Sequence, residues 1–427
     1  MKVLIVGGGG REHAIALKIK ENPEVTALYA APGNGGIAQI ATCLPFKATD
    51  VDGIVRWAAE NKVDFVIVAP DDPLCLGMVD ALAEQGIPAF GPRKNAAIIE
   101  GSKVFSKNLM KKYGIPTAAY ETFDDYDAAV KYLQTADMPI VVKADGLALG
   151  KGVLICPDRE SAVEAVASMM KEAKFGASGA RVVIEEFLTG PEVSVLAFTD
   201  GKMVKPMVSS MDHKRALDHD EGLNTGGMGT IAPNPCYTPE LARRCMDEIF
   251  LPTIAAMNAE GRTFTGCLYF GLMMTPKGPK VIEYNCRFGD PETQVVLPLL
   301  KSDLLTIMRA TVDGTLADTP VEFASGAACC VVLASGGYPV SYKSGYPISG
   351  LDEAGKTATV FHAGTKLVDG QIVTAGGRVL GVTATADTLE AAIDKAYQAA
   401  DKITFTDMHM RRDIGQRALA SRKESHS

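Results

Sequence analysis

Residues Lys280–Glu292 read KVIEYNCRFGDPE and join a strand-like stretch to a row of polar side chains. If Lys280–Arg287 forms a β-strand, its period of two places four residues on one face: Val281, Glu283, Asn285 and Arg287. A carboxylate beside an amide oxygen suits Mg²⁺, and an arginine suits a phosphoryl group in transfer. Asp290 and Glu292 follow in a turn. We interpret the row as a metal and phosphoryl site, with an exposed ion-paired face as the alternative.

Two segments upstream carry lysines in places that suit polyphosphate. The stretch Lys143–Gly152 (KADGLALGKG) follows an apolar run and indicates a loop that closes over phosphate groups. It is not a Walker A loop, because Gly152 follows Lys151 where Ser or Thr is required. Lys103 and Lys107 stand four apart near a predicted helix N-terminus, where cations oppose the helix dipole and an anionic ligand would favour them. A hairpin with solvated lysines and a solvated helix face remain the alternatives.

The glycine cluster Gly7–Gly10 lies where a first strand runs into a helix. A dinucleotide fingerprint would require glycine at Glu12 and an acidic residue near Tyr29, so an NAD site is not predicted. A phosphate-binding turn beside Arg11 and a tight turn without ligand both remain open. The polar segment Met211–Gly229 lacks metal-ligand spacing and is interpreted as a loop that holds substrate.

The pattern of apolar runs predicts three regions. Residues 1–101 alternate unbroken apolar strands with helices, which is typical of a doubly wound parallel sheet. A new helix begins after Ser102, and strands and helices alternate through 102–325. Residues 326–427 resemble an appended α+β module. The expected fold class is therefore a multi-domain α/β and α+β protein.

Composition narrows the class of protein. The 43 Lys+Arg and 51 Asp+Glu residues give a net charge of −8 with no basic block, so no nucleic-acid partner is expected. The longest apolar run, Ala327–Ala334, is too short for a bilayer, so no membrane association is expected. Nine cysteines without a C-x-x-C pair favour a reducing cytoplasm. Without any family resemblance, the lysine, glycine and polar segments described above indicate an enzyme that uses ATP and Mg²⁺.

Eleven blocks together resemble the ATP-grasp superfamily and, within it, the glycinamide ribonucleotide synthetase family. They are GGGGREHA (7–14), APGN (31–34), EGSKVFSK (100–107), VVKADGLALGKGV (141–153), VIEEFLTGPEVS (183–194), DHKR (212–215), NTGGMG (224–229), EYNCRFGDPE (283–292), FHAGT (361–365), GGRVLGVTA (376–384) and RRDIG (411–415). The resemblance implies a two-lobed ATP-grasp core in 102–325 with a lid lobe at about 117–190. It also implies that ATP converts glycine to glycyl phosphate, which the amine of 5-phosphoribosylamine attacks in purine biosynthesis.

Site residues follow from the matching blocks. Those implied for ATP are Lys103, Lys143, Gly150, Lys151, Gly152, Glu185, Glu186, Leu188 and Glu192. Those implied for Mg²⁺ or Mn²⁺ are Glu283 and Asn285. Those implied for catalysis are Arg287, Lys143 and Asp290. Those implied for substrate are Gly9, Gly10, Arg11, Glu12, Asp212, Lys214, Asn224, Thr225, Gly226, Asp290 and Glu292. We expect a monomer whose small-molecule partners are ATP, glycine and 5-phosphoribosylamine.

Several positions depart from the expected pattern. Asp71-Asp72 replaces Glu-Ala, Leu223 replaces Pro, and Leu149 replaces Ala in the lid. Gly271 stands where many other ATP-grasp enzymes carry a metal-binding carboxylate, which leaves the metal to Glu283 and Asn285. Two alternatives remain: another ATP-grasp carboxylase that uses bicarbonate, and a nucleotide sensor without turnover.

Overall fold

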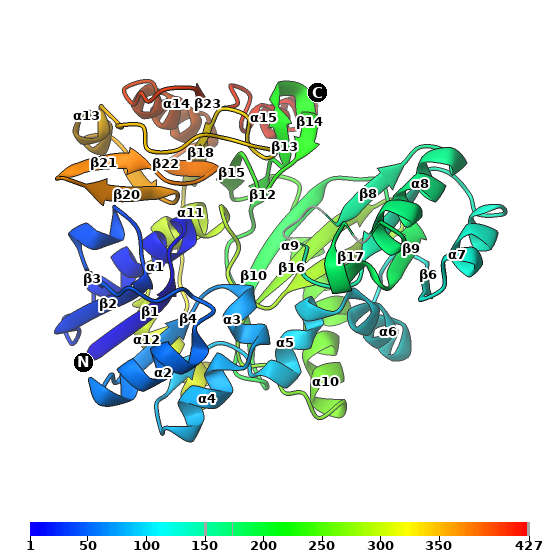
Figure 1. The fold of residues 1–427 in the computed structure, drawn as a ribbon, viewed down its shortest axis with the longest axis horizontal. Coiled ribbons are helices and arrows are strands. Elements are labelled where there is room, and N and C mark those ends of the chain that lie inside the picture. Colours follow the sequence, from blue (N-terminus) through cyan, green and yellow to red (C-terminus); the bar gives the residue numbers. More distant parts are fainter. Residues whose placement is uncertain (149–151, 173, 425–427) are drawn as a thin grey trace.

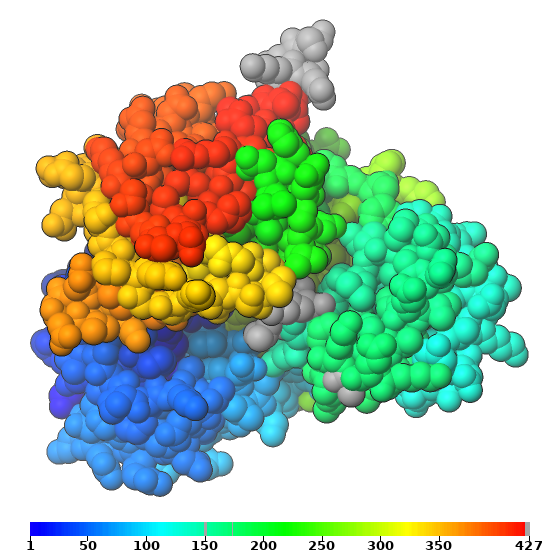
Figure 2. Space-filling view, turned by 45° about the horizontal axis from the view of Figure 1, so that its top comes forward, coloured from blue at the N-terminus to red at the C-terminus, as the bar shows by residue number. Residues whose placement is uncertain are grey.

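The computed structural model describes residues 1–148, 152–172 and 174–424. Figure 1 shows the N-terminal region (blue) beneath the C-terminal region (orange to red), with a separate lobe around β6–β9 on the opposite side. Figure 2 shows the same division on the surface, where the lobe in cyan and green stands beside the two stacked regions. The described residues therefore form a mixed α/β and α+β molecule, as the sequence predicts.

The N-terminal region is a parallel sheet in the order β3-β2-β1-β4-β5. Its strands are β1 (Lys2–Gly7), β2 (Ala27–Pro32), β3 (Thr42–Cys43), β4 (Phe65–Val68) and β5 (Ala89–Phe90). Its helices are α1 (Gly10–Lys20), η1 (Ile37–Gln39), α2 (Val51–Glu60), α3 (Asp71–Cys75), α4 (Met78–Glu84) and α5 (Lys94–Gly101). The central strands β1 and β4 are almost wholly buried, because helices cover both faces of a doubly wound sheet. The predicted doubly wound sheet is confirmed.

The lobe is an antiparallel sheet in the order β6-β9-β7-β8. Its elements are β6 (Tyr120–Phe123), α7 (Tyr126–Leu133), β7 (Ile140–Ala144), β8 (Val153–Cys156), α8 (Arg159–Met170), η2 (Gly176–Gly179) and β9 (Val182–Glu186). The preceding helix, α6 (Lys103–Tyr113), packs its Leu109 and Met110 into the larger core of the molecule instead. Apolar side chains of α7 and α8 pack on β7 and β9 in a core of their own. This separate core explains why the lobe stands apart in Figure 1.

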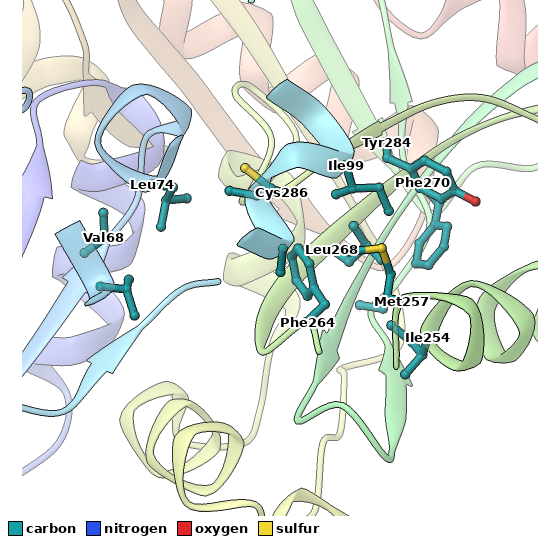
Figure 3. Close-up of a cluster of buried hydrophobic side chains, with 14 of the residues drawn as sticks. Val68, Leu74, Ile99, Ile254, Met257, Phe264, Leu268, Phe270, Tyr284 and Cys286 are labelled. Carbon is teal, nitrogen blue, oxygen red and sulfur yellow. The ribbon is translucent and has the colours of Figure 1, made fainter. Parts of the chain in front are cut away.

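A second antiparallel sheet, in the order β11-β10-β16-β17, contains the strand part of the Lys280–Glu292 segment. Its strands are β10 (Glu192–Thr199), β11 (Val204–Pro206), β16 (Gly266–Thr275) and β17 (Gly278–Asn285). The helices of this part are α9 (Pro239–Cys245), η4 (Met246–Phe250), α10 (Leu251–Ala259), α11 (Thr293–Val296), η5 (Leu297–Leu299), α12 (Leu304–Asp313) and η6 (Leu316–Asp318). Figure 3 shows Phe270, Tyr284 and Met257 in the core that joins this sheet to its helices. One face of β17 is thereby anchored by packing, which leaves the other face for polar groups.

The C-terminal region is a sheet in the order β12-β15-β18-β22-β19, with β23 also paired to β18. Its strands are β12 (Met211–Asp212), β15 (Gly229–Ala232), β18 (Ala327–Ser335), β19 (Thr359–His362), β22 (Arg378–Ala386) and β23 (Met408–His409). Its helices are α13 (Leu351–Gly355), α14 (Leu389–Ala400) and α15 (Gln416–Glu424), and the hairpin of β20 (Thr365–Val368) and β21 (Gln371–Thr374) stands beside it. Two of these strands, β12 and β15, come from the middle of the chain.

The segment Met211–Gly229 is therefore more ordered than the loop interpretation expects. It contains β12, the hairpin of β13 (Arg215–Leu217) and β14 (Glu221–Asn224), and the short helix η3 (Asp218–Asp220). Backbone pairing with β18 fixes its end, because β15 runs antiparallel to Ala328–Val331. No helix among residues 1–148, 152–172 and 174–424 combines the length and apolar character needed to cross a bilayer.

Candidate active site

The sequence predicts that Val281, Glu283, Asn285 and Arg287 lie on one face of the strand, and the structure differs at Val281. A register shift between Gly271 and Leu272 makes Val281 pair with Leu272 and Glu283 with Gly271, so Ile282 is the extra residue of a β-bulge. Val281 consequently faces the buried core with Tyr284 and Cys286. Placing Val281 on the polar face was wrong, because simple alternation does not hold across a bulge.

Gly271 lies directly opposite Glu283 in the β16–β17 pair. A Cβ atom at this position would approach Glu283 Cγ to 3.0 Å, so even a small side chain would press on the carboxylate stem. The strand opposite Glu283 thus contributes space rather than a second carboxylate.

Two lysines and a glutamate form a buried cluster between α6 and the lid sheet. Lys143 on β7 pairs with Glu185 Oε1 on β9, and Lys107 Nζ on α6 lies 3.0 Å from Glu185 Oε2. Lys107 also donates to Thr117 Oγ1 at 2.8 Å. Although burial favours the neutral acid, Lys143 and Lys107 hold the pKa of Glu185 below its usual range. The Glu185 side chain therefore orients Lys143, in addition to the ATP contact that the resemblance implies.

Lys103 stands at the first position of α6, and its Nζ donates to the Gly146 carbonyl at 2.9 Å. The preceding turn is capped twice, because Asp145 Oδ1 accepts from the Val104 N–H at 2.8 Å and from Ser102 Oγ at 2.9 Å. Burial lowers the pKa of Lys103, although Glu283 acts in the opposite direction. Hydrogen bonds thus join Asp145 and Gly146, at the base of the lid loop, to the first turn of α6.

Lys214, from the segment after β12, lies between two predicted site carboxylates. Its Nζ is 3.7 Å from Glu192 Oε2 and 3.8 Å from Glu283 Oε1. Burial favours neutral Glu283, but Lys214, Lys143 and Lys103 together hold its pKa below the usual value. Thr225 Oγ1 donates to the Lys214 carbonyl at 2.7 Å, which ties the NTGG segment to the same place. These contacts bring together Glu192 of the residues implied for ATP, Glu283 of those implied for the metal, and Lys214 of those implied for substrate.

Asn285 and Arg287 meet at Glu100, a residue the sequence analysis did not single out. With the amide oriented to satisfy its neighbours, Asn285 Nδ2 donates to Glu100 Oε1 at 3.0 Å. Arg287 Nη2 lies 3.2 Å from the same oxygen. Burial and the nearby Asp71 raise the pKa of Glu100, while Arg287 opposes the shift. Asp71, one of the departures from the family pattern, keeps its pKa below the usual range despite burial because Arg287 and Arg11 face it.

Glu283 and Asn285 fit a divalent cation that is completed by other ligands. Among the described residues, no group of three or more His, Cys, Asp or Glu side chains could hold a metal by itself. Mg²⁺ is commonly held by one or two protein oxygens together with phosphate oxygens and water. A carboxylate and an amide oxygen two residues apart on β17 supply such a pair.

Asp212 and Glu292 form a second acidic pair near the substrate segment. Tyr269 Oη donates to Glu292 Oε1 at 3.3 Å and lies 2.9 Å from Ser194 Oγ. Burial and the Glu292 carboxylate raise the pKa of Asp212 well above its usual value, although Lys214 and Arg378 act in the opposite direction. Burial also raises the pKa of Glu292. Burial of two neighbouring carboxyl groups therefore disfavours the charged form of each.

The N-terminal glycine turn closes one side of a cavity of about 350 Å³. The cavity is lined by Gly8, Gly9, Gly33, Asn34, Asp290, Ala363, Gly364, Thr365, Ala375 and Arg378. A Cβ atom on Gly8 would lie 2.4 Å from the Gly33 carbonyl oxygen, so only glycine permits this approach. A larger cavity of about 760 Å³ between α1 and β22 is lined by none of the predicted site residues.

Asp290 is held from both terminal regions. The Arg11 N–H donates to Asp290 Oδ2 at 3.2 Å, and Arg378 Nη1 donates to the Asp290 carbonyl at 2.9 Å. Burial disfavours its charge, but Arg378 and Arg11 hold the pKa of Asp290 below its usual value. Glu12 is buried and accepts from the Gly9 N–H at 2.8 Å, so it shapes the glycine turn rather than facing the cavity.

The remaining predicted residues are placed as follows. Gly10 packs against Gln294, since a Cβ atom there would lie 2.5 Å from Nε2. Asn224 ends β14, and the Gly226 N–H donates to Tyr338 Oη at 3.0 Å. Glu186 is exposed and accepts from the Ala119 N–H at 3.2 Å, while Leu188 is half-buried after β9.

The lid residues are only partly placed. Gly152 accepts from the Ala144 N–H at 2.8 Å. Gly150 and Lys151, together with Leu149, lie outside the described residues.

His13 and His362 connect the N- and C-terminal regions beside the cavity. His13 Nδ1 accepts from the His362 N–H at 2.8 Å, and Asn34 Nδ2 donates to the His362 carbonyl at 2.8 Å. Burial lowers the pKa of His13 to about 3 and that of His362 to about 4. Both rings are therefore neutral in the folded protein above pH 5.

Acid should weaken this contact. Unfolded histidine titrates near pH 6.5, so the unfolded chain binds more protons and stability is lost as the pH falls from about 6.5 toward 4. Each histidine costs about 2 kcal/mol of unfolding free energy between pH 7 and pH 5. We expect His13→Asn, whose Oδ1 can accept the same N–H, to show a smaller drop in melting temperature over this range. Parallel pH profiles for wild type and variant would contradict the assignment.

Comparison with known proteins identifies the fold and the family. Models of phosphoribosylglycinamide synthetase match the N domain at residues 1–100, the ATP-grasp (A) domain at 101–293 and the C domain at 328–417. The phosphoribosylamine–glycine ligase of Halalkalibacterium halodurans is 48% identical, and the match covers 100% of this chain and 99% of that protein. The crystal structure of phosphoribosylamine–glycine ligase from Thermotoga maritima has a TM-score of 0.86 at 34% identity, covering 97% of this chain and 100% of that one.

A more distant structure shows the fold alone. Biotin carboxylase from Campylobacter jejuni has a TM-score of 0.73 at 15% identity, covering 96% of this chain and 92% of that one. The three domain matches and the full-length relatives show that this chain belongs to the phosphoribosylglycinamide synthetase family of ATP-grasp ligases.

Proposed function

We propose that the chain joins glycine to 5-phosphoribosylamine with ATP, giving glycinamide ribonucleotide, ADP and phosphate. The proposal rests on one observation: residues 283–290 pass from the buried lysines to the cavity between the terminal regions. Lys143 Nζ donates to the Ile282 carbonyl at 3.2 Å and acts electrostatically on Glu283, and Asp290 lines the cavity between the terminal regions. A phosphoryl-transfer centre and a substrate cavity therefore adjoin along a single stretch of chain.

In the first step a glycine carboxylate oxygen bonds to the γ-phosphorus while the bond to ADP breaks. Catalysis of such a transfer is mainly positioning and charge stabilisation. Lys103 and Lys143 would hold the nucleotide phosphates, and Glu185 orients Lys143. Arg287 would face the transferring group. Mg²⁺ or Mn²⁺ held by Glu283 and Asn285 would supply further neutralisation of phosphate charge.

In the second step the amine nitrogen attacks the glycyl carbonyl carbon, phosphate leaves, and the amine loses a proton. The substrate would lie where the cavity meets Gly9, Asp290 and Arg378. The ionised Asp290 is suited to a cationic or amine group, and the raised pKa values of Asp212 and Glu292 suit a proton acceptor and donor close by. Lys214 and Asn224–Gly226 would close the other side.

Arg378 adds a residue that the sequence analysis left without a role. Its side chain is about one-fifth exposed and lines the cavity, which suits an anionic part of the substrate. We expect Arg378→Met to raise the KM for 5-phosphoribosylamine roughly tenfold or more while the KM for ATP stays within about twofold. Steady-state kinetics with each substrate varied in turn measures this split. Equal changes in both KM values would contradict a substrate role.

ADP release from Mg·ATP, with glycine and freshly made 5-phosphoribosylamine each omitted in turn, tests the function. Release that requires both substrates is the expected result. Release with bicarbonate in place of glycine would favour a carboxylase, and tight ATP binding without release would favour a nucleotide sensor. Either outcome would overturn the proposal.

A further inference from the structure

Glu100 is a buried carboxyl group at the end of α5 that accepts two hydrogen bonds and forms one ion pair, all with consecutive residues. Its Oε1 accepts from Asn285 Nδ2 at 3.0 Å and pairs with Arg287 Nη2 at 3.2 Å. Its Oε2 accepts from the Cys286 N–H at 2.7 Å. The Glu100 side chain is 7% exposed, so these contacts are largely shielded from water. The residues on either side of Cys286 are the proposed metal ligand and the proposed phosphoryl-binding arginine.

The packing around α5 makes Glu100 a fixed reference point. Figure 3 shows Ile99, the residue before Glu100, in the same buried cluster as Tyr284 and Cys286. The helix is therefore held against the end of β17 by apolar contacts on one side and by the carboxyl group on the other. A shift of α5 would therefore change the Glu100 contacts to Asn285, Cys286 and Arg287 together.

A glutamine could not satisfy the same three donors. One of its two terminal atoms is an NH₂ group, which would face either the Cys286 N–H or the donors of Asn285 and Arg287. The Asn285 amide is also affected, because Glu100 turns its nitrogen inward and thereby directs the amide oxygen away from Glu100. Outer partners of this kind orient ligand atoms and change metal affinity without touching the metal.

We propose that Glu100 is a positioning residue that sets the Asn285 amide and the Arg287 guanidinium in register, so that one buried carboxyl group links metal binding to phosphoryl transfer. Glu100 acts through these two residues and does not itself touch a substrate. The inference rests on the proposed function, because that function gives Asn285 and Arg287 their roles.

The first test compares Glu100→Gln with Glu260→Gln. Glu260, the residue that follows α10, is the matched control. It accepts hydrogen bonds from two side chains at the C-terminal end of α6, Lys112 at 2.5 Å and Tyr113 at 2.7 Å. We expect Glu100→Gln to weaken Mn²⁺ binding about tenfold, measured by EPR in the presence of ADP, and to lower kcat about tenfold. Glu260→Gln should leave both within about twofold. Glu100→Asp retains a carboxylate on a shorter side chain. Its Mn²⁺ affinity and kcat should lie between those of wild type and those of Glu100→Gln.

A double-mutant cycle with Asn285→Ala separates positioning from general destabilisation. If Glu100 acts through the amide, Glu100→Gln should change Mn²⁺ affinity by less than about twofold when Asn285 is already absent. An equal loss in both backgrounds, or a lower melting temperature with unchanged Mn²⁺ affinity and kcat, would overturn the proposal. Mn²⁺ binding needs no turnover, so it tests Glu100 even if wild type fails to use glycine and 5-phosphoribosylamine. That failure would contradict only the proposed function.

Discussion

Arg287→Ala should lower kcat by roughly 10³-fold while ATP affinity stays within a few-fold. The guanidinium is held by Glu100 and donates to the Phe288 carbonyl at 3.3 Å, so its position is set before substrate binds. A positive charge directed at the transferring phosphoryl group stabilises the transition state more than the ground state. Single-turnover ADP formation and equilibrium ATP binding measure the two effects separately.

Two comparisons make this result specific. Arg287→Lys keeps the charge but not the planar fork, and we expect it to recover only part of the lost rate. Arg412→Ala removes an exposed arginine that pairs with Asp401 at 2.6 Å, and kcat should not change. An Arg287→Ala enzyme with wild-type kcat would remove this residue from the mechanism.

Glu283→Gln should raise the Mg²⁺ concentration for half-maximal activity by about tenfold to 100-fold. The carboxylate is the charged member of the two-residue metal pair, and an amide oxygen is a weaker ligand for a hard cation. Lys214 should remain in place, because it still has Glu192 as a partner. A Mg²⁺ titration of ADP formation at saturating ATP measures the shift.

The control for this second experiment is Glu248→Gln. Glu248 pairs with Arg244 at 2.9 Å on the α9–η4 helix and has no contact with the site residues described above. Its Mg²⁺ titration should match wild type. A Glu283→Gln titration that also matched wild type would show that Glu283 does not bind the metal.

Local residue patterns predicted the elements well where one physical rule applied. The unbroken apolar runs of β1 and β4 identify strands buried on both faces, and the structure places them at the centre of a parallel sheet. The alternation rule also identified Glu283, Asn285 and Arg287 as neighbours. It misplaced Val281, because the bulge at Ile282 depends on pairing with β16 and has no local signature.

Functional residues that act across sequence distance were harder to find. Glu100 lay within a matching block, yet nothing nearby in sequence indicates that it meets residues 285–287. Asn34 and Arg378 likewise gain their places at the cavity only when β2, β19 and β22 come together. The sequence singled out Lys107 and Glu185 separately, but nothing in it indicated that the two side chains form a buried ion pair.

The sequence by itself determined the elements, the family and the chemical types present in the site. Apolar periodicity and glycine turns act over a few residues, so they can be interpreted without knowing what lies beside them. Only the tertiary structure decided which charged groups form ion pairs. Packing of distant segments brings together the lysines on α6 and β7, the carboxylates on β9 and β17, and Glu100 on α5. Electrostatic coupling depends on separation and burial in space, and neither quantity is encoded in local spacing.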